Sequence, residues 1–223
     1  MKTNPESGNA LIYVLVAIVL FAGLSFTLMR QTDTNEAGAL NAERVELLAT
    51  QITSYAAQAK SSVDQMLFQN LRAENLSFAR SGEAGFETEP PRHIMKVFHP
   101  DGGGLTPGQL PAEAISQSST TPPAGWYMGR FNNVEWTPSV AEDIILTAHQ
   151  IHPDICRNLN RKITGSDAIP ALTGGNLSDV LIDTSTNNNL TAALCPGCGE
   201  NFSLCISNSD ATMFSFYSII VGR

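Results

Sequence analysis

The longest hydrophobic run in the chain extends from Ala10 to Met29. It is twenty residues long and contains no charged side chain. As an α-helix, with a rise of ~1.5 Å per residue, it would extend ~30 Å, which is the thickness of the hydrocarbon core of a bilayer. The run therefore predicts a helix that lies in lipid or in an equally dry protein assembly.

The flanks of this run differ from those of a secretory signal peptide. Residues 1–8 form a short polar leader whose only basic side chain is that of Lys2, and Arg30 follows the run without an Ala-x-Ala-like cleavage site. A secretory signal has a more basic start, a shorter apolar core and small residues at its end. The run is therefore interpreted as a retained segment.

A second hydrophobic pattern continues beyond the run. Apolar residues that follow one another at intervals of mostly three to five residues, or at combinations of these, lie on one face of a helix. The residues with this spacing are Leu40, Val45, Leu48, Ile52, Tyr55, Ala56, Ala59, Val63, Met66 and Leu67. No proline interrupts the chain between Pro5 and Pro90. We expect one long helix over residues 9–80, or two helices with a bend near residues 32–38, apolar all round over 9–30 and amphipathic afterwards.

Residues 81–223 predict a globular head. Glycine and proline recur from Ser81 to Gly125, which indicates loops around one short strand at 94–98. Further strands are expected at 125–131 and 134–136. The pair Ser139 and Glu142 forms a capping box, which predicts a helix over the apolar residues 144–148.

Proline at position 153 predicts the start of another helix, over residues 153–163. The last third of the chain is typical of β-structure, with β-branched or aromatic runs at 180–182, 203–206 and 213–221 separated by Asn, Gly and Ser. Because helices come first and strands last, the pattern indicates an α+β fold with a C-terminal antiparallel sheet.

Charge and composition exclude one class of function. The formal net charge is −8, and no cluster of basic residues is longer than the pair Arg161 and Lys162. Binding of nucleic acid through its phosphates requires a basic surface. We therefore expect no nucleic acid bound by a basic patch.

Four cysteines follow the hydrophobic run, at positions Cys156, Cys195, Cys198 and Cys205. The spacing Cys195-Pro-Gly-Cys198 is compatible with a redox pair or with half of a zinc site. Neither a following helix nor a second close pair supports these alternatives, so disulfides are the preferred interpretation for an exported domain. Three pairings are open, and we prefer Cys198 with Cys205 and Cys156 with Cys195.

No catalytic constellation accompanies these features. His149 and His152 have a spacing at which they could share a metal ion, but they lack an accompanying carboxylate motif. We therefore expect no enzymatic activity, no cofactor and no metal site.

The leader ending in Gly8, followed at once by the run SGNALIYVLVAIVLF, an amphipathic helix, loops and a terminal sheet with cysteines, resembles the type IV pilins and pseudopilins. The resemblance implies that a prepilin peptidase cuts between Gly8 and Asn9. It also implies that the helix first anchors the subunit in membrane lipid and then packs with homo-oligomeric or other pilin-like subunits. The expected assembly residues are Leu11, Tyr13, Val14, Ile18, Phe21, Leu24 and Leu28.

Two positions depart from the family pattern. Asn9 stands where the first mature residue is usually apolar, and Tyr13 stands where the fifth is usually Glu. Some minor pilins and pseudopilins also lack that Glu, so we expect a minor or divergent subunit. The resemblance implies an inner-membrane protein with an exported head, which later enters an extracellular filament or a periplasmic pseudopilus. The alternative is a single-pass membrane-anchored exported binding domain that does not polymerise.

Overall fold

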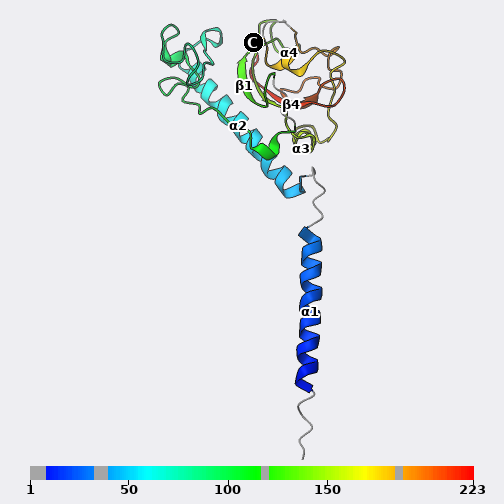
Figure 1. Cartoon of the computed structure of the whole chain (residues 1–223). Helices are drawn as coiled ribbons and strands as arrows, with labels where there is room; N and C mark the ends of the chain where they lie inside the picture. The colour runs from blue at the N-terminus through cyan, green and yellow to red at the C-terminus, as the bar shows by residue number, and fades with distance from the viewer. Residues whose placement is uncertain (1–8, 33–39, 117–120, 184–187) are drawn as a thin grey trace, which may run out of the picture. The chain divides into compact units, whose positions relative to one another are not determined.

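The computed structural model describes residues 9–32, 40–116, 121–183 and 188–223 (Figure 1). They divide into two units, the first ending at Asn41 and the second running from Ala42 to Arg223. Helix α1 (Asn9–Thr32) lies in the first unit and covers the hydrophobic run. We call the second unit the head. The bend expected near residues 32–38 falls almost entirely on residues outside those described.

Four antiparallel strands form the centre of the head. They are β1 (Gly125–Arg130), β2 (Ile144–His149), β3 (Ser203–Ser207) and β4 (Phe214–Val221), and their order in the sheet is β1-β2-β4-β3. The central strands β2 and β4 are buried along almost their whole length. The predicted α+β class with an antiparallel sheet is confirmed, although two of its strands come from the middle of the chain.

Helix α2 (Ala42–Phe68) and helix α3 (Pro153–Thr164) pack against each other, and both contact β4 (Figure 1). The buried side chains of α2 recur at helical spacing, as the sequence pattern predicts, and include Val45, Leu48, Ala49, Ile52, Ala56, Ala59, Val63 and Met66. Helix α3 begins at the predicted proline and ends at Gly165, whose φ of 79° terminates the helix.

The end of the amphipathic helix is a correction to the sequence prediction. We expected helix to residue 80, but α2 ends at Phe68 and the chain turns at Asn70, whose φ is 63°. Asparagine adopts this left-handed conformation more easily than most residues. Beyond the turn only the short 3₁₀ helix η1 (Ala73–Asn75) is present in residues 69–80.

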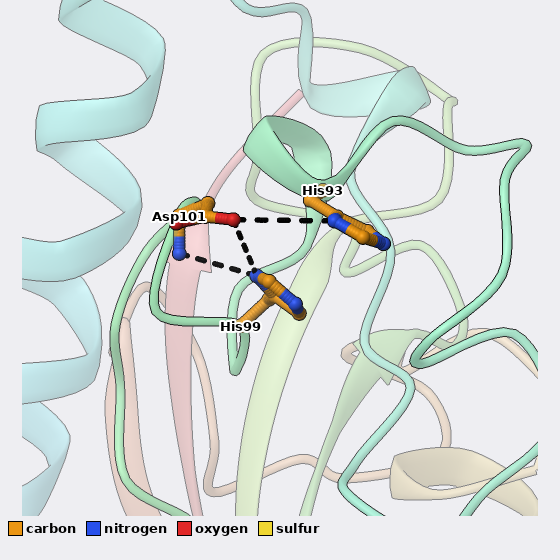
Figure 2. A group of neighbouring side chains, drawn as sticks. All are labelled: His93, His99 and Asp101. Atoms are coloured by element: carbon orange, nitrogen blue, oxygen red, sulfur yellow. Dashed lines mark hydrogen bonds and ion pairs between the residues drawn. The ribbon is translucent and has the colours of Figure 1, made fainter.

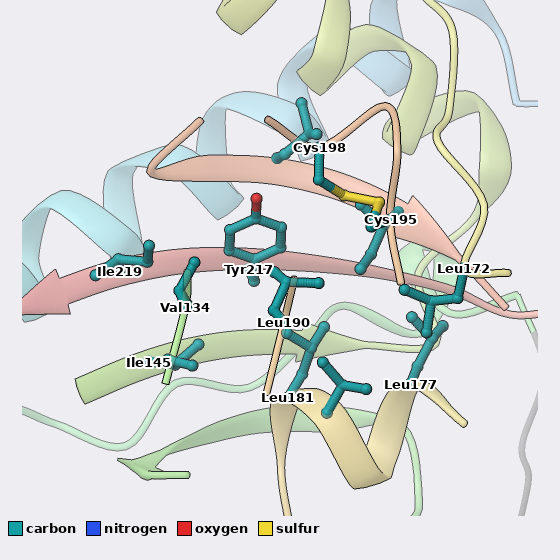
Figure 3. Close-up of a cluster of buried hydrophobic side chains, with 13 residues drawn as sticks. Val134, Ile145, Leu172, Leu177, Leu181, Leu190, Cys195, Cys198, Tyr217 and Ile219 are labelled. Atoms are coloured by element: carbon teal, nitrogen blue, oxygen red, sulfur yellow. A yellow bond between two sulfur atoms is a disulfide. The ribbon is translucent and has the colours of Figure 1, made fainter. Parts of the chain in front are cut away.

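The two faces of the sheet carry different packing layers. On β4, Phe216 lines a groove together with Ala56 of α2. Its neighbour Tyr217 must point to the other face, since successive side chains of a strand alternate. Figure 3 shows Tyr217 on that second face, in one cluster with Leu177 and Leu181 of helix α4 (Leu177–Leu181).

The segment predicted to be a helix at 144–148 is strand β2, so the capping-box interpretation is wrong. All six residues of β2 are buried, because β2 is covered on both faces and flanked by strands on both sides. The sequence of a strand in this position is a continuous apolar run. Such a run is compatible with a strand and also with a short buried helix. The Ser139 hydroxyl instead accepts from the backbone N–H of Ala141.

Three shorter strand predictions are also wrong. Residues 180–182 belong largely to helix α4, whose buried residues Leu177, Val180 and Leu181 have helical spacing. Segment 94–98 begins in the 3₁₀ helix η2 (His93–Met95) and pairs only through an isolated bridge between Ser77 and Lys96. Segment 134–136 likewise makes only an isolated bridge, between Val134 and Leu190.

A buried lysine organises part of the loop-rich region between α2 and β1. The Lys96 side chain is fully buried, and its ammonium group donates to the backbone carbonyl oxygens of Phe86 and Thr88, at 2.7 Å each. Gly103 lies against α2, where its carbonyl oxygen accepts from the Ser62 hydroxyl. A Cβ on Gly103 would lie 2.6 Å from that hydroxyl oxygen, so glycine is required for this close approach.

The buried side chain of Asn160 in α3 covers the outer edge of strand β3. Its amide oxygen accepts from the backbone N–H of Cys205, and its amide nitrogen donates to the carbonyl oxygens of Cys205 and Ala168, all at 2.8 Å. Asn160 thus replaces a neighbouring strand at this point of the edge.

We predict that Asn160→Ala lowers the free energy of unfolding of the oxidised full-length protein by about 3 kcal/mol. The estimate counts roughly 1 kcal/mol for each of the three lost hydrogen bonds. Urea unfolding in detergent, followed by circular dichroism, measures the change. The control is Arg157→Ala, which removes an exposed ion pair of the same helix and should cost less than about 1 kcal/mol. Equal losses in both variants would contradict the role assigned to Asn160.

Candidate functional site

Helix α1 presents large apolar side chains to its surroundings on all sides. The helix begins at Asn9, while Gly8 of the expected processing site lies outside the described residues. Among residues 12–21, the large apolar side chains are half exposed or more, including Phe21 at 77%: Ile12, Tyr13, Val14, Leu15, Val16, Ile18, Val19, Leu20 and Phe21. The predicted assembly residues Tyr13, Val14, Ile18 and Phe21 belong to this set. The side chains of Leu11, Leu24 and Leu28 fall outside what the structure describes.

This exposure has a large energetic consequence. Burial of one such side chain is worth roughly 1.5–3 kcal/mol, so burial of all nine exceeds about 10 kcal/mol. That sum matches the whole stability of an ordinary domain. Helix α1 therefore favours any apolar environment that can cover it. Over the residues that the structure describes, no helix is both long enough and apolar enough to cross a membrane.

The cysteines form two disulfides, as predicted, but the preferred pairing is wrong. Cys156 is bonded to Cys205 and Cys195 to Cys198. Cys205 alternates along β3 with Leu204 and Ile206, which both belong to the cluster beneath α4, so its sulfur points to the opposite face, where α3 carries Cys156. The Cys195–Cys198 disulfide lies in that cluster (Figure 3). The two disulfides therefore stabilise opposite faces of the sheet.

The two histidines that the sequence placed close together do not share a site. His149 of β2 is fully buried and its Nδ1 lies 2.8 Å from the Ser215 hydroxyl of β4. His152 instead caps α3, where its Nδ1 accepts from the backbone N–H of Asp154. Burial lowers the pKa of His149 to about 4, so its imidazole is neutral at pH 7.

A different group of side chains comes together in the loop-rich region, as Figure 2 shows. The Asp101 carboxylate lies 3.7 Å from Nδ1 of His99 and 4.0 Å from Nδ1 of His93. The two imidazole rings are stacked, with centroids 4.2 Å apart. The His99 side chain is 10% exposed, that of His93 30% and that of Asp101 69%, so one side of the group is open to solvent.

Sequence reasoning missed this group because His93 is separated from the other two residues by a 3₁₀ turn and a buried lysine. One signal was present in the chain, which contains the tripeptide His-Pro-Asp twice, at 99–101 and at 152–154. In both copies Nδ1 of the histidine accepts from the backbone N–H of the aspartate, at 3.1 Å and 3.3 Å. A tripeptide of this kind predicts a local contact, but it does not predict the second imidazole.

Comparison with protein-family models, with curated proteins and with solved structures finds no match to this chain.

We predict that the two disulfides contribute unequally to stability. Residues 156 and 205 are 49 apart in sequence and residues 195 and 198 are 3 apart, so closure of the longer loop removes more entropy from the unfolded chain. Chain-entropy estimates are ~4 kcal/mol for the longer loop and ~2 kcal/mol for the shorter.

The test compares the free energy of unfolding of two double variants, Cys156→Ala with Cys205→Ala and Cys195→Ala with Cys198→Ala. All four cysteines are fully buried, so the loss of packing is similar in both variants. Peptide mapping without reduction checks the pairing first. A larger loss in the second variant would refute this ranking.

We also predict that the head loses stability in mild acid because of His149. Its pKa is about 4 in the folded protein and about 6.5 in the unfolded chain, so the unfolded chain binds the proton first as the pH falls. The neutral His149 therefore makes its full contribution to the free energy of unfolding above pH 6.5. That free energy falls by up to about 3 kcal/mol as the pH decreases to about 4. His149→Gln should flatten this part of the unfolding profile. The difference in the free energy of unfolding between the wild type and His149→Gln at pH 7.5 measures the effect of altered packing alone and serves as the control.

Proposed function

We propose that the chain is a structural subunit of a type IV pilus-like or pseudopilus filament. Before assembly its N-terminal helix anchors it in the membrane and the head is exported. In the filament, copies of this helix, or those of related subunits, cover one another. A prepilin peptidase would expose Asn9 as the new amino terminus.

The observation that carries the proposal is the apolar surface of α1. Its described side chains from Ile12 to Phe21 are exposed around the whole helix, whereas the head has a complete core of its own. A helix of this kind is stable only in lipid or among similar helices. The small residues Ala10, Ala17, Ala22, Gly23 and Ser25 favour the second environment, because they allow close approach of helix backbones.

The two disulfides of the head also support the proposal. Disulfides persist in oxidising compartments outside the cytoplasm. An exported head attached to an apolar helix fits both the filament subunit and the alternative, a membrane-anchored binding domain that does not polymerise. Polymer formation distinguishes the two functions.

We predict that Ile18→Glu decreases the amount of polymer at least tenfold, because a carboxylate near the centre of an apolar helix costs roughly 3 kcal/mol. Tyr13→Glu should retain polymer, because it restores the carboxylate found at this position in the family that the chain resembles. Both variants are expressed with a prepilin peptidase, and the polymer is quantified by sedimentation and electron microscopy of surface or periplasmic fractions.

Two controls accompany this comparison. Arg157→Ala changes a half-exposed side chain of α3 in the head, outside the proposed assembly helix, and it should assemble like the wild type. Gly8→Leu should leave the leader attached, as judged by intact mass. A wild-type protein that keeps residues 1–8 and stays monomeric in its native membrane would refute the filament and favour the anchored domain.

A further inference from the structure

We propose that His93, His99 and Asp101 bind one divalent transition-metal ion, of which zinc fits best (Figure 2). One imidazole nitrogen from each histidine and one carboxylate oxygen lie within 4.8 Å of one another. This site lies in the head and does not depend on the proposed filament.

The hydrogen bonds around the two imidazoles differ in what they leave for a metal ion. Nε2 of His93 lies 3.2 Å from the backbone carbonyl oxygen of Glu87, which can only accept, so Nε2 carries the proton and Nδ1 is unprotonated in the neutral ring. Nδ1 of His99 accepts from the backbone N–H of Asp101 and is likewise unprotonated. The Nδ1 atoms of both histidines thus lie near one carboxylate, and the His99 electron pair must leave its hydrogen bond to bind a metal ion.

Three such acceptors repel one another unless a positive charge, from a proton on an imidazole or from a metal ion, lies between them. A divalent cation supplies that charge and converts the repulsion into three coordinate bonds. The contact between Nε2 of His93 and the carbonyl of Glu87 is the kind of outer hydrogen bond that orients a metal-binding histidine. In the neutral ring, this contact directs Nδ1 of His93 toward the Asp101 carboxylate.

The three ligand atoms, which lie within 4.8 Å of one another, must move closer together to bind one ion. Ligand bonds of ~2.0–2.1 Å in a tetrahedral site place the ligand atoms about 3.3 Å apart. The carboxylate lies 3.7 Å and 4.0 Å from the two Nδ1 atoms, so it must move by roughly half an ångström. The Asp101 side chain is 69% exposed and can make this movement, although His99 must then exchange its bond to the Asp101 backbone for the metal ion.

The donor set determines which ion is expected. Two imidazoles and one carboxylate suit zinc and its neighbours, nickel and copper, whereas calcium and magnesium prefer oxygen ligands. Three protein ligands leave a fourth position for water, and the exposure of Asp101 gives the ion access. The carboxylates of Glu87 and Glu89, which are exposed in the adjoining loop, add negative charge that attracts cations.

A bound ion would connect two parts of the loop-rich region. His93 belongs to η2, and Asp101 precedes the glycines that lie against α2. The ion would therefore hold the 86–95 loop to the turn that packs on α2. We assign it a stabilising role.

The second His-Pro-Asp tripeptide provides a matched internal control. His152 and Asp154 repeat the contact of His99 and Asp101, with a carboxylate oxygen 3.5 Å from Nδ1. The proposed site has the additional imidazole of His93, whereas the Asp154 carboxylate is also paired with the Arg157 guanidinium. If a local histidine and aspartate pair were sufficient, both tripeptides would bind zinc.

The experiment is titration of the oxidised, EDTA-treated full-length protein in detergent with zinc chloride, followed by calorimetry. We expect one zinc ion per chain, with binding weakened at least about tenfold by His93→Gln and by Asp101→Asn, because each removes one ligand. His152→Gln should bind zinc like the wild type. Calcium chloride should give no binding heat.

Both ligand variants change partly exposed side chains, and thermal unfolding without metal verifies that they fold. Added zinc should raise the melting temperature of the wild type and of His152→Gln, but not that of His93→Gln. Absence of zinc binding by the wild type overturns the proposal. Undiminished binding by His93→Gln, or loss of binding in His152→Gln, overturns it equally, because the ion would then lie elsewhere.

Discussion

The packing of α2 on the antiparallel sheet is the interaction on which the rest of the head depends. The apolar face of α2 covers one side of β4, and α3 is held between this helix and the edge strand β3. On the other side, α4 and the segment with Cys195 and Cys198 cover Tyr217 and its neighbours. Burial of β2 and β4 on both faces follows from these two layers. Without α2, the parts of β4 and β2 that this helix covers would be exposed to water.

The packing of the head also covers part of one edge of the sheet, strand β3. An exposed edge strand is a template for pairing with another chain. On β3, the Asn160 side chain occupies the backbone groups of Cys205, and residues 170–172 bond to Ser207. The edge is thus covered at two points, whereas α1 presents its apolar side chains openly.

Sequence periodicity predicted the two helices whose burial is one-sided, since α2 and α3 each have one apolar face. Strand β4 is buried on both faces, and its length and its β-branched and aromatic residues identified it instead. Strand β2 was misassigned because complete burial erases the alternation that identifies a strand. The disulfide pairing and the group of His93, His99 and Asp101 depend on which face or loop each residue occupies. Neither the pairing nor the group can be predicted from the spacing of these residues in the sequence.

The two halves of the head are stabilised by different means. All four cysteines lie in residues 156–205, and the loop-rich segment 81–125 has none. That segment depends on the Lys96 ammonium group, on the close contact of Gly103 with α2, and on hydrogen bonds between the Tyr55 hydroxyl and the backbone of Thr106 and Gly108. A metal ion held by the three side chains would act there as the disulfides act in the C-terminal half. It would add a cross-link between loops, at a place where the chain already brings its ligands together.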